Sequence, residues 1–583
     1  MELPRIVARA RCTVLLALLA VFALASPALA RAVGPATGSA PAVLDADPFR
    51  PPPGYRLAGA QVRRAAARAP VIAAELRRHP GLRPFVYTRG TGRWQVSWFA
   101  PGTHGRELAQ AYVSDRTGRV TEAWTGFQVA WAMARGYPGA FGRHLNSWYV
   151  WVPLCGLFAV AFVPRRRRSW GILQLDAAVL LAFSISLAFF NHARIGLSVP
   201  LAYPCLLYLL VRMFRLAAGR GRPRAPVEFL VPASWLVIGL LFLVGFRVVL
   251  NATDANVIDV GYAGVIGADR VVHGQPLYGG WPSSIRQGDT YGPVNYEAYV
   301  PFRLVSGWSG SWDDLPAAHG AAAAFDLLTL VGLFLLGRMA RGPDTGVRLA
   351  YMWAAYPFTA YALESNSDDA LVALLVVATL LLARRAPARG AVAALAGLTK
   401  FAPLALAPLL WRGLEERLRW RALLGFAGAF ALASVIVTLP VLLDGSAELT
   451  TFWRHTIGYQ ANRGSPFSVW GLWGGLGIEQ RLVQGAAVGL ALAGFVFPRR
   501  RGLLEVASMG AAILIAVQLG LGHWFYLYIP WFFPLVAVAL ELAAARPAPE
   551  LDAVSPALER GPARPAPGGI TVTASPRRQP GAT

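Results

Sequence analysis

The chain contains few of the residues on which small secreted or metal-binding proteins depend. Only three of its 583 residues are cysteine, Cys12, Cys155 and Cys205, and each lies inside an apolar run. Neither a disulfide framework nor a cysteine-based zinc site is therefore expected. Charged residues are also scarce at 15%, whereas hydrophobic residues make up 55%. This composition excludes an ordinary soluble protein and is typical of an integral membrane protein.

Lysine is almost absent, since Lys400 is the only one and arginine supplies the other basic residues. The formal net charge of +24 would suit a nucleic-acid-binding protein. The arginines, however, gather in short clusters directly after apolar runs, as at 165–168 and 499–501. Such clusters mark the cytoplasmic ends of membrane helices, so we expect membrane lipids as partners and no nucleic acid.

The two ends of the chain differ from its middle. Residues 1–30 combine Arg5, Arg9 and Arg11 with a short apolar run and an A-L-A sequence, which predicts a secretory signal peptide or a retained anchor. The segment that follows would then lie outside the cytoplasm. Residues 544–583 are rich in proline, alanine, glycine and arginine, which predicts a disordered cytoplasmic tail.

Residues 31–144 are expected to form a small folded domain before the apolar runs begin. A helical pattern covers 61–78 and is interrupted at Pro70. The strand-like runs that follow are 93–99, 108–115 and 118–124, with a hairpin turn at 115–118. A helix followed by W-Q-V and Y-V-S-D-x-x-G-x-V resembles a PepSY-type domain, which implies a small extracytoplasmic α+β module. No catalytic constellation is visible in it.

From residue 145 onward, apolar segments follow one another closely, and arginine clusters indicate their direction. Residues 145–227 are expected to hold the first membrane helices, and 228–543 the main membrane domain. The segment 390–411 could span once, but a single span would place the arginines of 417–421 outside. We therefore predict a re-entrant hairpin of two short helices that meet near Lys400. The predicted segments are 146–164, 170–190, 197–213, 229–250, 318–337, 347–363, 370–383, 390–411, 420–442, 482–498, 503–521 and 525–543.

The predicted fold is an all-α polytopic membrane protein of about 11–13 membrane helices, with a small α+β extracytoplasmic domain. Its longest polar interruption, 251–302, is dense in carboxylates, tyrosines and amides. Ionisable groups near a membrane helix are costly unless they have a function, so this loop is the candidate active site. On the predicted topology, the polar residues that gather at the outer surface are Asp254, Asp259, Asp289, Glu364, Asp368, Asp369, Arg454, His455, Arg463 and His523.

A family resemblance rests on motifs in and after this loop. They are D-V-G-Y at 259–262, H-G-Q-P-L-Y at 273–278, D-T-Y-G-P-V-N-Y-E-A-Y-V-P-F at 289–302, N-S-D-D-A-L-V-A-L-L at 366–375, G-L-T-K-F-A-P at 397–403 and R-G-S-P-F-S-V-W-G at 463–471. Residues 228–543 thereby resemble the GT-C superfamily of membrane glycosyltransferases, most nearly glycosyltransferase family 87, the polyprenol-phosphate-mannose-dependent mannosyltransferases. The resemblance implies a polyprenyl-phosphate sugar donor, an extracytoplasmic lipid or glycan acceptor, no nucleotide, and a loop carboxylate as general base.

By its position, Asp259 matches the acidic residue that opens the family's D-x-x-Y pattern, and Asp254 is the competing candidate. An acceptor hydroxyl must lose its proton as it attacks the anomeric carbon, and a positioned carboxylate that takes this proton contributes about 10²–10⁴-fold. The alternative for Asp259 is a solvated loop acid or a helix cap. Further residues expected to bind substrate are Tyr262, Asp289, Tyr291, Asn295, Tyr296, Asn366, Asp368 and Asp369.

The leaving polyprenyl phosphate needs positive charge beside it. Lys400 could serve, or it could pair with a buried carboxylate such as Asp326. His523 could serve, or it could pack under Trp524. The full set of expected cationic contacts is Lys400, Arg454, His455, Arg463 and His523.

Structural alternatives also exist for the polar loop residues. Tyr291, Tyr296 and Tyr299 could form an aromatic belt on a short helix begun by Pro293. The Ser-Asp-Asp sequence at 367–369 could simply cap the next helix. A divalent cation at Asp368 and Asp369 is a further alternative, which no other ligand spacing supports, and the leading expectation is that no metal or other cofactor is bound.

Two other functions compete with glycosyl transfer. A transporter or flippase of a lipid-linked substrate would also use many helices and intramembrane charge, but such proteins commonly show internal repeats. We find no repeat in this sequence. A sensor with a membrane anchor would need far fewer helices than are predicted. An integral-membrane glycosyltransferase of the cell membrane, with its active site on the extracytoplasmic face, is therefore the leading hypothesis.

Overall fold

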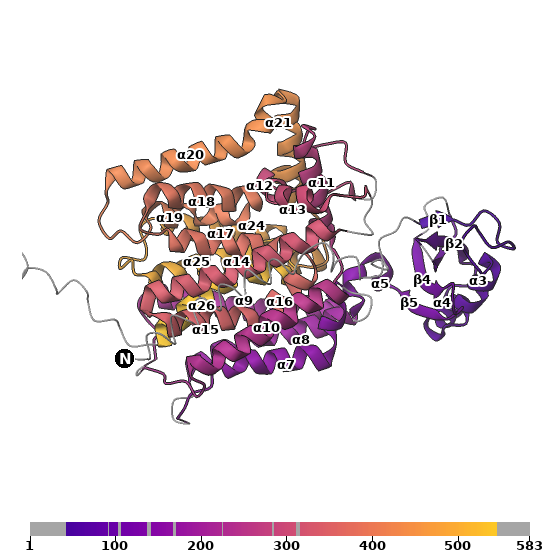
Figure 1. The fold of residues 1–583 in the computed structure, drawn as a ribbon, viewed down its shortest axis with the longest axis horizontal. Coiled ribbons are helices and arrows are strands. Elements are labelled where there is room, and N and C mark those ends of the chain that lie inside the picture. The colour runs from indigo at the N-terminus through magenta and orange to yellow at the C-terminus, as the bar shows by residue number, and fades with distance from the viewer. Residues whose placement is uncertain are drawn as a thin grey trace, which may run out of the picture. The chain divides into compact units, whose positions relative to one another are not determined.

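The computed structural model describes residues 42–544 except for short gaps at 91, 103–105, 137–140, 167–170, 224–225, 283–284 and 311–314. The expected signal peptide at 1–30 and the expected tail beyond residue 544 lie outside the described residues. Along the chain, a small sheet domain comes first and a bundle of helices follows (Figure 1).

The small domain is an antiparallel five-stranded meander with two helices packed against it, which confirms the predicted small N-terminal domain. The apolar residues of its third strand, Trp94, Val96 and Trp98, alternate with polar ones and lie in the domain's core. Gly118 takes a φ of +65° in the predicted hairpin turn. The elements are β1 Ala42–Leu44, α3 Gly59–Ala67, α4 Pro70–Arg78, β2 Arg83–Arg89, β3 Arg93–Phe99, β4 Glu107–Ser114 and β5 Val120–Thr125.

Among the described residues, six helices are long and apolar enough to cross a membrane. They are α8 Ile172–Asn191, α9 Ile195–Ala217, α10 Ala233–Asp254, α14 Pro316–Arg341, α20 Trp420–Leu443 and the continuous stretch Tyr526–Ala544, which joins η7 to α26. Shorter helices complete the bundle: α7 Trp148–Val160, α17 Asp369–Leu381, α24 Gly477–Ala493 and α25 Leu503–Leu519. The predicted all-α polytopic membrane fold is confirmed.

Two predicted segments are each divided into shorter helices. The segment 347–363 forms α15 Pro343–Ala355 and α16 Pro357–Glu364, because Pro357 has no amide hydrogen to continue the first helix. The predicted hairpin forms α18 Ala386–Thr399, η5 Ala402–Leu406 and α19 Ala407–Arg412. The Arg389 guanidinium donates to the carbonyls of Leu410 at 2.6 Å and of Trp411 at 3.3 Å. The two arms therefore return to the same end of the bundle.

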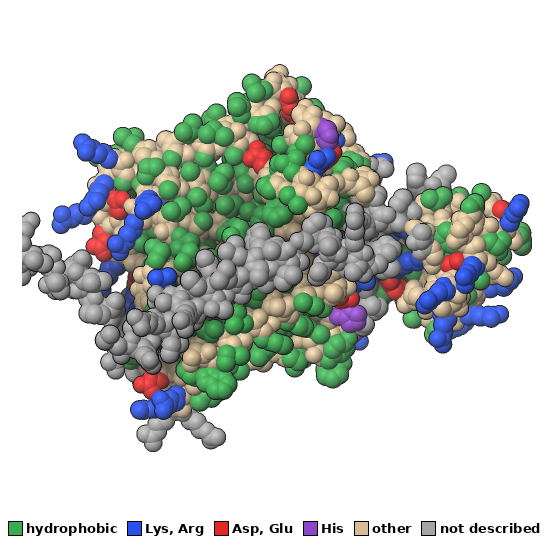
Figure 2. Space-filling view, viewed as in Figure 1, with side chains coloured by type: hydrophobic (Ala, Val, Ile, Leu, Met, Phe, Trp, Pro, Cys, Tyr) green, Lys and Arg blue, Asp and Glu red, His purple; other side chains and the backbone are tan. Residues whose placement is uncertain are grey.

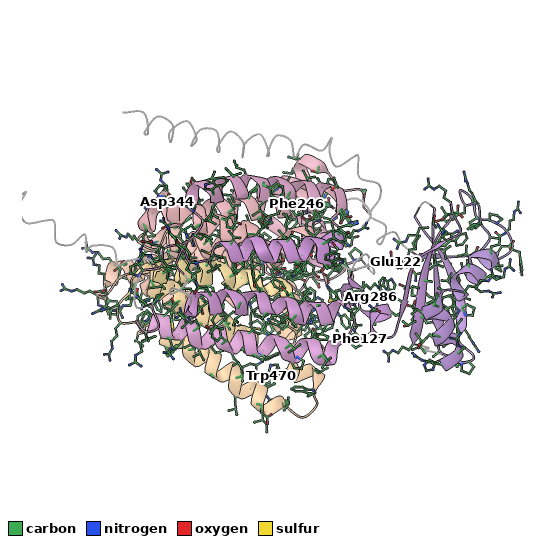
Figure 3. All side chains as sticks on the ribbon, turned by 90° about the horizontal axis from the view of Figure 1, so that it is seen from below. Glu122, Phe127, Phe246, Arg286, Asp344 and Trp470 are labelled. Atoms are coloured by element: carbon green, nitrogen blue, oxygen red, sulfur yellow. The ribbon has the colours of Figure 1, made fainter. Side chains whose placement is uncertain are left out.

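The two ends of the bundle differ in charge. Arginine side chains gather at one end (Figure 2). Asp344, in the first turn of α15, lies at this end, whereas Arg286, in the loop between residues 272 and 293, lies at the opposite end (Figure 3). The polar loop and the arginine-rich turns are thus separated by the length of the bundle.

Buried ion pairs join helices that are distant in sequence. Arg348 pairs with Glu541 at 3.0 Å and Arg212 with Asp176 at 2.9 Å. Arg247 pairs with Asp326 at 2.5 Å, and the Trp353 indole donates to the same carboxylate. Asp326 is therefore held by Arg247, so it is not the partner of Lys400. The expected pairing of Lys400 with a buried carboxylate is found instead with Asp368 and Asp369.

Three short helices organise the polar loop, and glycines let them pack closely. They are α11 Asp259–Val272, α12 Pro293–Glu297 and α13 Val300–Ser306. A Cβ at Gly267 would lie 2.2 Å from the Tyr296 ring, and one at Gly264 would lie 2.7 Å from the Tyr299 ring. A Cβ at Gly292 would lie 1.8 Å from the carbonyl oxygen of Leu398, near the end of α18. These contacts hold the loop against the helix that ends beside Lys400.

Candidate active site

Lys400 lies between two carboxylates at the end of α18. Its Nζ is 2.6 Å from Oδ1 of Asp368 and 2.6 Å from Oδ1 of Asp369. The Trp531 indole donates to the same Asp369 oxygen at 2.8 Å. All three charged side chains are buried, and they join the start of α17 to the tip of the hairpin. The only lysine of the chain is therefore held at the site by charge.

Aromatic rings surround the same ammonium group. Its Nζ lies 5.6 Å from the ring centre of Tyr291, 5.9 Å from that of Tyr528 and 5.3 Å from that of Trp531. Such distances allow favourable cation–π contacts. Tyr291 comes from the polar loop and the other two from the last membrane segment, so Lys400 connects three parts of the chain.

The turn between α16 and α17 fits against the start of α11. Asn366 takes a φ of +50°, accepts from the Asn251 amide at 2.9 Å and donates to the Asn256 carbonyl at 3.0 Å. The Ile258 amide donates to the Ser365 carbonyl at 2.9 Å. Asp368 occupies the N-cap position of α17, but its side chain makes no capping hydrogen bond. Helix capping alone thus does not account for this carboxylate.

Asp259 is the first residue of α11, and its carboxylate accepts from the Val260 amide at 2.9 Å. Its side chain is exposed, yet desolvation by the surrounding protein raises its pKa, against the opposing effects of Arg463 and Lys400. Asp259 thus combines an exposed side chain with a raised pKa. Arg463 and Lys400 influence it electrostatically, and Arg463 makes no ion pair with a described residue.

A second polar group lies in the neighbouring loops. Asp289 is 2% exposed, accepts from the Gly279 amide at 2.7 Å and lies 2.6 Å from Nδ1 of His455. His455 belongs to the π-helical turn η6 Arg454–Gly458, which follows α21 Ser446–Trp453. Glu448 of α21 accepts from the Tyr278 amide at 2.8 Å. The long loops after α10 and α20 are therefore tied together, and π-helical turns are frequent at functional sites.

Several residues expected at the site have structural partners elsewhere. Asp254 binds His144, with 2.7 Å from Oδ1 to Nδ1 and 2.8 Å from Oδ2 to the amide nitrogen. His523 bonds to Ser465 at 2.7 Å, and burial together with Arg463 lowers its pKa well below the usual value, which favours a neutral imidazole. Arg454 is exposed and makes no ion pair with a described residue.

The remaining loop residues are buried inside the protein. Tyr296 donates to the Gly288 carbonyl at 2.9 Å, and Tyr262 packs near Trp308. Asn295 is fully buried, and its amide has no hydrogen-bond partner among the described residues. Tyr296 and Tyr299 are at 0% exposure, so they are core residues and not part of a lipid-facing belt.

Tyr528 and Trp531 belong to the Lys400 cluster although the sequence did not mark them as site residues. The run W-F-Y-L-Y-I-P-W at 524–531, directly after His523, was the available signal. It also fits an ordinary apolar membrane helix, so only the folded structure distinguishes these two rings. Among the described residues, no group of three or more His, Cys, Asp or Glu side chains has the arrangement of a metal site.

Residues 290–545 match glycosyltransferase family 87. The match indicates a membrane glycosyltransferase, and it covers somewhat less than half of the 583-residue chain. It includes the Lys400 cluster, Tyr291 and Arg463 but begins after Asp259 and Asp289. A search of the curated proteins found no match.

Proposed function

We propose that the protein is an integral-membrane glycosyltransferase that moves a mannose-like sugar from a polyprenyl-phosphate donor to an extracytoplasmic lipid or glycan acceptor. The match to glycosyltransferase family 87 supports the reaction class. The observation that carries the finer proposal is the position of Asp259, an accessible but desolvated carboxylate within the electrostatic reach of Lys400 and Arg463. One site thus offers a base for the acceptor and positive charge for the donor.

The proposed step takes place at the anomeric carbon of the donor. The acceptor hydroxyl oxygen forms a bond to this carbon while its proton passes to the Asp259 carboxylate. The bond from the anomeric carbon to the phosphate oxygen breaks, and its electron pair stays on the polyprenyl phosphate. A raised pKa makes Asp259 a stronger base than an ordinary aspartate, provided that the carboxylate is ionised.

Arg463 is the best-placed group to meet the phosphate. Lys400 is accompanied by two carboxylates, so this triad alone has no excess positive charge. Arg463 has no such partner among the described residues and acts electrostatically on Asp259 and Tyr291. Lys400 then orients the site and lessens the repulsion between Asp368 or Asp369 and the phosphate. The proposal includes no metal ion, because an ammonium group already lies between these carboxylates.

The proposed orientation places the site on the extracytoplasmic side. The arginine-rich turns gather at the end of the bundle opposite to the polar loop (Figures 2 and 3). Positively charged turns favour the cytoplasm. A lipid-linked donor would reach the site with its phosphate near the outer membrane surface and its chain among the helices.

Product analysis tests the reaction class. Purified protein should convert a polyprenyl-phosphate sugar and an acceptor extract into a glycosylated acceptor, detected by mass, with release of polyprenyl phosphate. The competing flippase hypothesis, which the broken helix at Lys400 also suits, predicts movement of the lipid-linked sugar across a vesicle membrane without any change in its mass. Movement of the lipid-linked sugar across the membrane without formation of a glycosylated acceptor would overturn the proposal.

A further inference from the structure

The N-terminal domain carries an unusual concentration of arginine. Residues 48–106 contain eleven arginines but a single acidic residue, Glu75. Glu75 is buried and is shared by Arg78 at 3.5 Å and His79 at 3.4 Å. The whole domain, residues 42–125, has thirteen arginines against six acidic residues, so it keeps an excess of positive charge.

Part of this charge forms one face of the two helices. The exposed arginines of this face, which we call the α3–α4 basic face, are Arg63, Arg64, Arg68, Arg77 and Arg78. Figure 2 shows arginine side chains over the helical side of the domain. Four of the five, all except Arg78, make no ion pair or side-chain hydrogen bond with a described residue. Elsewhere in the domain an arginine has an internal partner, since Arg93 forms an ion pair with Glu122 at 2.6 Å.

Helix electrostatics explain only part of this arrangement. Arg64, Arg77 and Arg78 lie in the last turns of their helices, where a positive charge is favourable. Arg64 and the C-cap residue Arg68, however, are four residues apart, and like charges at this spacing repel each other. A face that keeps such repulsion without an internal partner is suited to an external anion.

We infer that the α3–α4 basic face docks onto the anionic phospholipid headgroups of the membrane that holds the helices. The short connection between the domain and the membrane helices supports the membrane surface as the partner. Strand β5 ends at Thr125, and the Phe127 and Trp131 rings already contact Phe467 at centroid distances of 6.4 and 4.8 Å. So short a connection keeps the domain at a high effective concentration near the bilayer surface.

The chemistry of the face also suits a lipid surface. Val71, at the start of α4, is 47% exposed, so an apolar side chain accompanies the arginines. Each arginine near an anionic membrane surface contributes about a fivefold gain in binding. Several headgroups can engage the arginines independently, so no preformed pocket is required. The inference does not depend on glycosyl transfer or on which side of the membrane the domain occupies.

The test uses the full chain in lipid nanodiscs. Val71→Cys, in a background with Cys12, Cys155 and Cys205 replaced by alanine, carries an environment-sensitive fluorophore. In phosphatidylcholine with phosphatidylglycerol, the emission should shift to shorter wavelength than in phosphatidylcholine alone, and high salt should reverse the shift. The variant R63Q/R64Q/R68Q/R77Q should lose the shift, with about a fivefold loss of docking for each arginine removed.

A variant with the same loss of charge distinguishes binding by the α3–α4 basic face from general electrostatic attraction of the domain to the membrane. R50Q/R83Q/R116Q/R119Q removes the same charge from exposed positions outside α3 and α4 and should keep the shift. The inference would be overturned if both variants lost the emission shift equally. It would also be overturned if the shift were as large in phosphatidylcholine alone as with phosphatidylglycerol. A shift produced only by a soluble anionic polysaccharide would also overturn it, because the partner would then be a glycan. Unchanged far-ultraviolet circular dichroism checks that each variant is folded.

Discussion

At the residue level, the proposed site combines two side chains with opposite requirements. In the proposed reaction Asp259 must reach substrate and accept a proton, and it is exposed although its pKa is raised. Lys400 is buried and must stay charged between Asp368 and Asp369. Substitution of Asp259 is therefore expected to affect catalysis more than stability. Substitution of Lys400 is expected to affect stability at least as much as catalysis.

The pH dependence of transfer follows from the raised pKa of Asp259. A general base works only when ionised, so the rate should fall as the pH drops through this pKa. The fall should lie above the ordinary aspartate value of about 3.9. Initial rates measured across the acidic range, with folding checked at each pH, provide the test. An acidic limb at or below the ordinary value would contradict the role.

The same pKa shift predicts the effect of Asp259→Asn on stability. A group whose pKa is raised by folding stabilises the protein below its unfolded pKa, and this contribution disappears as the pH rises through the folded pKa. At neutral pH the ionised Asp259 thus slightly destabilises the folded state. The variant should unfold at the same or a slightly higher temperature than the wild type at pH 7. A clear decrease in the unfolding temperature would point to a structural role.

Removal of the Lys400 charge should destabilise the protein strongly. Lys400→Met leaves two buried carboxylates without a counter-charge, which typically costs about 3–5 kcal/mol. The triple variant K400M/D368N/D369N should recover part of this loss. Thermal unfolding in detergent measures both, and Arg454→Met, at an exposed position, is the control. If Lys400→Met were as stable as the control, the ion pairs of Lys400 with Asp368 and Asp369 would not contribute to stability.

At the scale of elements, the short helices of the polar loop position the site. The start of α11 is held by the turn between α16 and α17, and its glycines face the Tyr296 and Tyr299 rings. The sequence predicted a short helix begun by Pro293, which is confirmed as α12. It did not predict the close packing of α11, because the glycines also suited a flexible loop.

Gly267→Ala tests this packing. The added methyl group would lie 2.2 Å from the Tyr296 ring, so α11 or the ring must move. We expect a loss of about 1–3 kcal/mol in stability, as for other overpacked sites, together with lower transfer activity. Gly245→Ala, on α10 with open space around its Cβ position, is the matched control. Equal stability of the two variants would show that α11 tolerates displacement.

At the scale of the whole molecule, apolar runs and arginine clusters were enough to predict the helices and the hairpin. The site was harder to predict, because its parts lie far apart in the sequence. Lys400 pairs with carboxylates about thirty positions earlier, and Trp531 reaches the same group from the last helix. Asp254, a catalytic candidate by position, proved to be bound to His144, and no sequence pattern joins those two residues.

Orientation is a prediction about the whole molecule. In the cysteine-free background, Arg286→Cys should react with a membrane-impermeant thiol reagent only from outside the cell, and Arg384→Cys only from the cytoplasm. Both positions are exposed, and they belong to the polar loop and to an arginine-rich turn. Labelling of Arg286→Cys only from the cytoplasm would reverse the topology and remove the proposed access of an extracytoplasmic acceptor.

We propose that Asp259 accepts the proton of the acceptor hydroxyl, and the glycosyl-transfer rates of two asparagine variants give the sharpest test of this role. Asp259→Asn and Asp254→Asn each remove one carboxylate from neighbouring positions of the same loop. With a polyprenyl-phosphate sugar as donor, Asp259→Asn should lose about 10²–10⁴-fold in transfer rate while remaining folded. Asp254→Asn should keep most of its activity. Full activity in Asp259→Asn, or loss confined to Asp254→Asn, would show that Asp259 is not the general base.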